Sequence, residues 1–116
     1  MARSVASSMN TTCDINIMGG YPVLKNDPEV TTRSIDYASE FLGKDKVTSL
    51  DPRMTAEDFA FFADIVPATF YRLGTADPEN KLSCDLHTSN FDIDESALKT
   101  GMGLMAYMTI RHLQNQ

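Results

Sequence analysis

The amino-acid sequence predicts an α/β fold, because segments with strand-like alternation follow segments with helical spacing. From residue 26 onward, the expected order is helix, strand, helix, strand, loop and helix. Residues 1–24 differ, since a short helix is followed there by a single alternating strand. We therefore expect a parallel or mixed sheet covered by helices, with a boundary near residues 22–26.

The composition is that of one modest globular domain. The chain has 116 residues, of which 42% are hydrophobic and 22% are charged, and it contains no internal repeat. It carries 10 Lys and Arg residues against 16 Asp and Glu residues, so its formal net charge is −6. The positive charges are scattered singly, which excludes a broad surface for nucleic acid or for an anionic membrane.

Targeting and redox signals are weak in this sequence. No segment approaches the roughly 20 apolar residues that a bilayer-spanning helix needs. Residues 1–10 lack the apolar run of a secretory signal peptide. The two cysteines, Cys13 and Cys84, have neither a disulfide framework nor CxxC spacing. We expect reduced thiols and a cytoplasmic location.

The first half of the chain contains four expected elements. Residues 2–9 have the spacing of a short helix, and residues 13–18 alternate like a half-buried strand. Asp27 and Pro28 form a strong helix start, with Asp27 as the N-cap and Pro28 at the first helical position. An apolar stripe at helical spacing follows, and Gly43 is expected to end this helix. Residues 47–50 predict a short strand.

The second half predicts two helices that flank a strand and a loop. Residues 55–58 have capping-box spacing and start a short helix that ends at Pro67. Residues 68–73 predict a strand, and the polar residues 75–86 predict a surface loop. The final helix starts at a cap supplied by Asp92 or Asp94 and runs to about residue 112. Its two glycines, at positions 101 and 103, indicate that one face lies close against a sheet.

Two ionisable residues, His87 and Glu57, are candidates for a functional site. His87 lies in a polar loop just before the last helix, where an imidazole can bind a metal or exchange a proton. Its plainer interpretation is a surface histidine beside an ordinary helix start. Glu57 lies in the first turn of a helix and could face a cleft. Stabilisation of its carboxylate by the helix dipole is sufficient by itself and is the favoured explanation.

Other residues carry less functional signal. His112 lies near the end of the last helix, where a cation suits the helix dipole, so we interpret it as a capping residue. Cys13 and Cys84 are expected to be structural or incidental. The sequence contains no dinucleotide-binding glycine motif, no phosphate-binding loop, no GxSxG and no HExxH.

Several segments, taken in order, resemble the carboxy-terminal third of the zinc-dependent amidohydrolases of the aminoacylase/carboxypeptidase family. The branch they resemble most is that of hippurate hydrolases and N-acyl-amino-acid deacylases. Residues 86–101 resemble the family's "HxPxFxxDExxLxxG" segment, which is the most specific match, and residues 54–60 resemble its "EDFA" segment. Supporting matches lie at residues 20–22, 26–27 and 67–74.

The resemblance implies a partial three-layer α/β/α metallopeptidase-like catalytic domain over residues 25–116. It implies that residues 1–24 are a remnant of an α+β lid or dimerisation domain. His87 would be a ligand of the metal, which is zinc or another divalent metal such as manganese or cobalt. Glu57 would lie beside the site in a supporting role. Paired metals would activate a water for hydrolysis of the amide bond of an N-acyl amino acid or related peptide.

The sequence also departs from the family pattern. Thr55 and Ala56 replace the family's paired glycines, and Ser89 replaces a proline after the histidine. The remaining metal ligands and the general base have no match here, so we expect a fragment that is inactive alone and binds metal weakly. The alternative is a non-catalytic structural or assembly unit. Unpaired strand edges also predict a homo-oligomer or a domain-swapped association.

Overall fold

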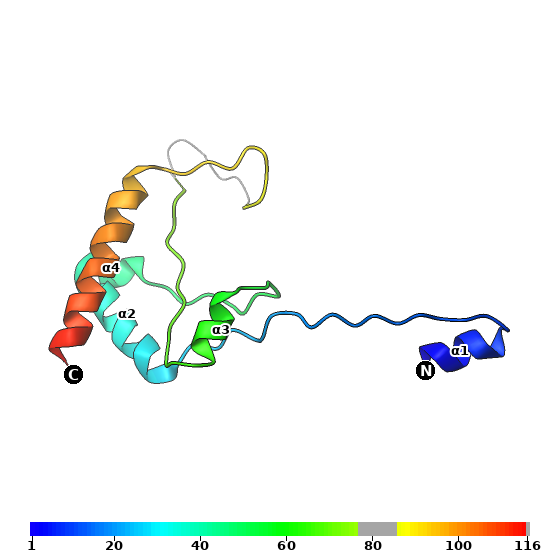
Figure 1. Ribbon diagram of the computed structural model, residues 1–116. Helices are drawn as coiled ribbons and strands as arrows, with labels where there is room; N and C mark the ends of the chain where they lie inside the picture. Colours follow the sequence, from blue (N-terminus) through cyan, green and yellow to red (C-terminus); the bar gives the residue numbers. More distant parts are fainter. Residues whose placement is uncertain (77–85, 116) are drawn as a thin grey trace.

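The computed structural model describes residues 1–76 and 86–115, and three of the four expected helices follow the sequence expectations (Figure 1). Cys84 and most of the expected loop at residues 75–86 lie outside the described residues. The elements in chain order are α1 (Ala2–Ser8), α2 (Pro28–Leu42), the single-turn 3-10 helix η1 (Lys44–Lys46), α3 (Phe59–Ala63) and α4 (Ser96–Gln114). In the described part of the chain, no helix is long and apolar enough to cross a membrane.

Helix α2 begins and ends where its sequence predicts. The Asp27 carboxylate accepts hydrogen bonds from the backbone N–H groups of Glu29, at 3.0 Å, and Val30, at 2.9 Å. These bonds satisfy two of the N–H groups that the first helical turn leaves without partners. Pro28 occupies the first helical turn, and Gly43 follows the last one with a φ of 96°. The N-cap and the glycine stop are both confirmed.

The start of α4 resolves the choice between two aspartates. The Asp94 carboxylate accepts a hydrogen bond from the Ser96 backbone N–H at 2.9 Å, whereas that of Asp92 bonds only the adjacent Ile93 N–H. Hydrogen bonds from Ser96 lower the pKa of Asp94 below its ordinary value. At α3, in contrast, the expected cap from residue 55 is wrong, since α3 begins only at Phe59.

Helices α2 and α4 pack against each other and contain most of the buried apolar surface (Figure 1). Tyr37 of α2 and Leu104 of α4 are buried. The rings of Phe41 and Tyr107 lie 5.4 Å apart between the two helices. A Cβ atom at Gly103 would approach the Phe41 ring to 2.9 Å. The glycine therefore permits the close contact of the two helices.

A polar cluster ties the outer ends of the same two helices together. Glu40 of α2 accepts hydrogen bonds from Arg111 at 3.0 and 3.1 Å and from the Tyr107 hydroxyl at 2.9 Å. The Arg111 guanidinium also lies 5.5 Å from the centre of the Tyr37 ring. The hydrogen bonds from Arg111 and Tyr107 hold the pKa of Glu40 below its ordinary value.

The expected strands at residues 13–18, 47–50 and 68–73 are wrong for the described part of the chain, in which no residue is assigned to a strand. The three segments are non-helical, but a strand needs a neighbouring strand to complete its ladder of hydrogen bonds. Residues 68–73 are held by the start of α2 and the residue before it. The Asn26 side chain bonds both the N–H and the carbonyl of Phe70, at 2.8 and 2.9 Å, and the Asp27 N–H donates to the Ala68 carbonyl at 2.8 Å. Gly101 packs against Leu73 of this segment rather than against a sheet.

The molecule is far more open than a compact domain. Its radius of gyration is 20.9 Å, whereas a compact chain of 100 residues has about 13 Å. Its accessible surface is 10003 Å², against about 6,300 Å² expected for a compact monomer of this mass. Helix α1 lies apart from the remaining helices at the end of a long extended segment (Figure 1). The helical body therefore leaves large apolar surfaces uncovered.

Candidate functional site

His87 lies in a turn shortly before α4, and its side chain is exposed. Its backbone adopts a φ of 65°, a left-handed conformation that histidine adopts more readily than bulky apolar residues do. Within the described residues, the imidazole has no hydrogen-bond partner and no ion pair. A ligand can thus reach the ring, although none of the side chains that the structure describes orients it by a hydrogen bond or an ion pair.

Glu57 is half-buried just before α3. Its carboxylate accepts a hydrogen bond from the Phe59 backbone N–H at 3.2 Å. Phe59 in turn packs against Phe70, with 5.7 Å between the ring centres. This geometry matches the structural role at a helix start that the sequence left open for Glu57. The supporting role implied by the family resemblance stays a prediction.

The described residues do not bring a metal site together. His87 is on the segment that leads into α4, and Glu57 precedes α3 in a separate part of the molecule (Figure 1). Nowhere in residues 1–76 and 86–115 do three His, Cys, Asp or Glu side chains gather as a metal-binding group. A catalytic zinc needs about three protein ligands plus water. The donors present here therefore do not fit a complete metal centre.

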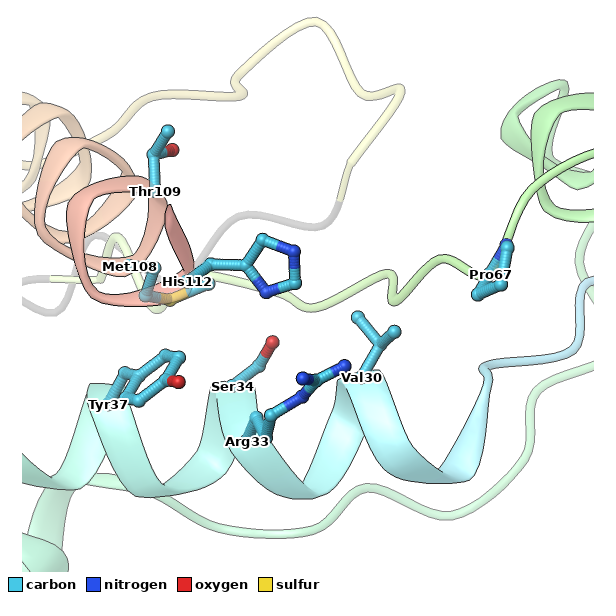
Figure 2. Close-up of a pocket in the computed structure, with 8 residues that line it drawn as sticks. All are labelled: Val30, Arg33, Ser34, Tyr37, Pro67, Met108, Thr109 and His112. Carbon is cyan, nitrogen blue, oxygen red and sulfur yellow. The ribbon is translucent and has the colours of Figure 1, made fainter. Parts of the chain in front are cut away.

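A cavity of about 530 Å³ lies between α2, α4 and the turn after α3, and Figure 2 shows the side chains around it. Arg33 and Ser34 reach it from α2, and His112 reaches it from α4. The complete lining is Val30, Arg33, Ser34, Tyr37, Pro67, Met108, Thr109 and His112. His112 does lie in the last turn of α4, as expected of a capping residue, but its ring also faces this cavity.

Arg33 is held incompletely beside the cavity. Its Nη2 atom lies 3.5 Å from the exposed carboxylate of Glu29, one helical turn earlier. Its Nε atom is enclosed and has no hydrogen-bond partner. An enclosed donor without an acceptor costs about 1–3 kcal/mol. Sequence reasoning did not single out Arg33; the available signal was a charge at the edge of the apolar stripe that contains Val30 and Ser34.

A second, larger cavity of about 730 Å³ separates the helix pair from the end of η1 and the non-helical segments 47–50 and 69–74. Ile35 and Leu42 from α2 and Leu104 from α4 line one side of it. Leu50 and Leu73 from the two segments line the other side. The sequence predicted strands on this side of the helices, and none of the described residues there is assigned to a strand.

Comparison with known proteins identifies the family. The sequence profile described as peptidase family M20/M25/M40 matches residues 4–111. The chain belongs to this family. Membership confirms the resemblance predicted from the "EDFA"-like and "HxPxF"-like segments. It also implies a metallopeptidase-like α/β domain, to which the described residues contribute helices and non-helical segments.

Curated relatives of the M20/M25/M40 chain are described as hydrolases of several kinds. It is 26% identical over 116 residues to a probable hydrolase of Synechocystis, covering 99% of this chain and 30% of that protein. It is 33% identical over 99 residues to an N-acetyldiaminopimelate deacetylase of Lactobacillus acidophilus, with coverages of 84% and 24%. It is 30% identical over 112 residues to thermostable carboxypeptidase 1 of Saccharolobus solfataricus, with coverages of 96% and 28%.

These comparisons cover only part of each relative. The chain spans less than a third of the length of the three proteins it matches. No solved structure matches the chain significantly. The family assignment therefore rests on sequence along nearly the whole chain, while the activity of the whole protein is a matter for proposal.

Proposed function

We propose that this chain is the carboxy-terminal part of a metal-dependent amidohydrolase that cleaves the amide bond of N-acyl amino acids or related peptides. The observation that carries the proposal is the M20/M25/M40 match over residues 4–111. The names of two relatives, a deacetylase that acts on an N-acetylated amino acid and a carboxypeptidase, support this substrate class. The isolated chain has no activity of its own in this proposal.

In this proposal His87 contributes one metal ligand to the complete enzyme. Its exposed ring supports the role, because a ligand must be reachable by a metal held mostly by other segments. The metal is zinc or another divalent ion such as manganese or cobalt, since neutral imidazole suits all of these. Glu57 is the supporting residue beside the site, and its half-buried carboxylate is positioned by the start of α3.

The domain assignment is part of the same proposal. Residues 1–24 belong to a lid or dimerisation domain, and residues 25–116 belong to the three-layer catalytic domain. The separation of α1 from the helical body supports a boundary in this region (Figure 1). The second cavity and the non-helical segments beside it support a sheet that forms only when further strands pair with them.

The partners follow from the same features. The acidic composition and the lack of a basic patch argue against binding to nucleic acid or to an anionic membrane. We place the parent enzyme in the cytoplasm and its ligand among small acyl amino acids. Without the remaining strands, the uncovered apolar surfaces favour self-association or domain swapping.

A chimaeric enzyme tests the proposal. In it, the aligned segment of thermostable carboxypeptidase 1 is replaced by this chain, and hydrolysis of N-acyl amino acids is measured. The expected result is metal-dependent hydrolysis that His87→Ala lowers by more than the ~10–100-fold typical of residues that only support metal ligands. Asn90→Ala, in the same exposed turn, is the matched control and should leave the rate unchanged.

Two outcomes would contradict the proposal. Full activity of the chimaera with His87→Ala would remove the ligand assignment. A folded chimaera that binds metal but never hydrolyses an N-acyl amino acid would favour the alternative of a structural or assembly unit. Calorimetric titration of the isolated chain with zinc complements the test: a tight, stoichiometric site in the monomer would contradict the assignment of the other ligands to other segments.

A further inference from the structure

The cavity between α2 and α4 combines basic groups with apolar ends. Arg33 and His112 approach the same space from opposite helices, and the Ser34 hydroxyl points toward it (Figure 2). Val30 and Pro67 lie at one end of this space, and Tyr37 and Met108 lie at the other (Figure 2). The cavity therefore offers hydrogen-bond donors in its middle and apolar contacts at its ends.

The charge around the cavity favours an anion. Among the described residues that line it, none is acidic. Glu29 pairs with Arg33 only loosely, at 3.5 Å, and its side chain is largely exposed. The enclosed Nε–H of Arg33 lacks an acceptor. The guanidinium thus keeps donor capacity that no side chain of the described structure uses.

The shape of the site selects among anions. A guanidinium presents its N–H groups in a plane that matches the two oxygens of a carboxylate. The volume of about 530 Å³ is within the ~300–1,000 Å³ typical of small-molecule pockets. The apolar ends would contact a short hydrocarbon group, which an inorganic anion lacks.

We propose that this cavity binds a small organic carboxylate that carries a short apolar group. The carboxylate would accept hydrogen bonds from Arg33 and Ser34, with His112 covering it from α4. The apolar group would lie against Val30 and Pro67. This inference does not rest on the proposed amidohydrolase function, because its residues are separate from His87 and Glu57.

Nuclear magnetic resonance of the ¹⁵N-labelled full chain tests the inference with matched probes. Isovalerate has the stated chemistry, isovaleramide has the same shape without the charge, and inorganic phosphate has charge without the apolar group. With isovalerate we expect saturable chemical-shift changes at Arg33, Ser34 and His112. Isovaleramide and phosphate should each bind at least about tenfold more weakly. Shifts that do not saturate, or equal binding of isovaleramide or phosphate, would overturn the proposal.

Substitutions locate the binding energy. Arg33→Gln should weaken isovalerate binding about tenfold or more, because the charge-assisted hydrogen bonds are lost. Arg53→Gln removes the same charge from an exposed position outside the cavity and should leave binding unchanged. His112→Gln keeps Arg33 and serves as the second variant if Arg33→Gln perturbs the fold. Unchanged isovalerate binding in both cavity variants would rule the site out. A spectrum of the wild-type chain showing that α2 and α4 do not pack against each other would also rule it out.

Discussion

The packed pair of α2 and α4 differs from the exposed turn that carries His87 in how its side chains are held. The helix pair is joined by the contact between the Phe41 and Tyr107 rings, by the close approach of Gly103 to Phe41 and by the Glu40 cluster. The His87 turn has a left-handed residue and an exposed ring. The difference teaches that this segment of an M20/M25/M40 protein packs its helix pair with its own side chains, whereas the described residues gather no metal-binding group around His87.

The largest expected effect comes from the centre of the helix pair. Leu104→Ala should lower the free energy of unfolding by about 2–5 kcal/mol, because it removes buried methyl groups and leaves a cavity. Urea unfolding followed by circular dichroism measures the change. Met105→Ala, on the exposed side of α4, is the control and should have little effect. Equal losses in both variants would break the distinction between packed and exposed faces.

A smaller effect is expected at the start of α2. Asp27→Ala should destabilise the chain by about 0.5–2 kcal/mol, because the N–H groups of Glu29 and Val30 lose their acceptor. Asp27→Ser retains a capping oxygen and should recover most of the loss in the same unfolding experiment. If serine restored nothing, the stability would depend on the charge of Asp27 rather than on its hydrogen bonds.

The Glu40 cluster predicts a pH dependence that the His87 turn should not share. Because the pKa of Glu40 is lowered in the folded state, its contribution to stability is present above the ordinary glutamate value of 4.5. The contribution is lost as the pH falls through the lower folded-state value. Glu40→Gln should therefore flatten the acid side of the stability profile, and Asp36→Asn on the same helix is the control. An unchanged profile in Glu40→Gln would contradict the role of the cluster.

The smallest effect is expected at the candidate ligand itself. His87→Ala should change the free energy of unfolding by less than about 0.5 kcal/mol, because its side chain is exposed and exposed substitutions have small effects. The same variant is expected to lower hydrolysis strongly in the chimaera, so stability and activity should separate at this residue. A large loss of stability in the isolated chain would show that His87 has a structural role and would remove the contrast between the two regions.

Local signals in the sequence were sufficient for most helices. The Asp27 cap, Pro28 and Gly43 specify the ends of α2 through contacts between residues only a few positions apart. The Asp94 alternative at α4 is correct for the same reason. The "HxPxF"-like segment around His87 was sufficient for the family. These features need no knowledge of distant parts of the chain.

The pairing of strands and the cavity between the helices could not be predicted without the tertiary structure. The alternating segments at residues 13–18 and 68–73 have strand-like patterns, but a ladder forms only where a second strand lies alongside. A close approach at Gly101 and Gly103 was expected against a sheet, but the structure places Leu73 of a non-helical segment and Phe41 of α2 there, and both lie far away in sequence. The cavity that joins Arg33 to His112 likewise depends on how two helices cross, which no spacing along the chain reports.

The sequence by itself therefore determined the ends of α2, the capping residue of α4 and the family to which the chain belongs. Capping and periodicity are encoded within a few residues, and family motifs are encoded in their order along the chain. Only the tertiary structure decided that α2 and α4 form the scaffold, that the strand-like segments stay unpaired and that a basic cavity lies between the helices. Those features depend on surfaces brought together from distant positions, and burial of apolar area acts on such surfaces.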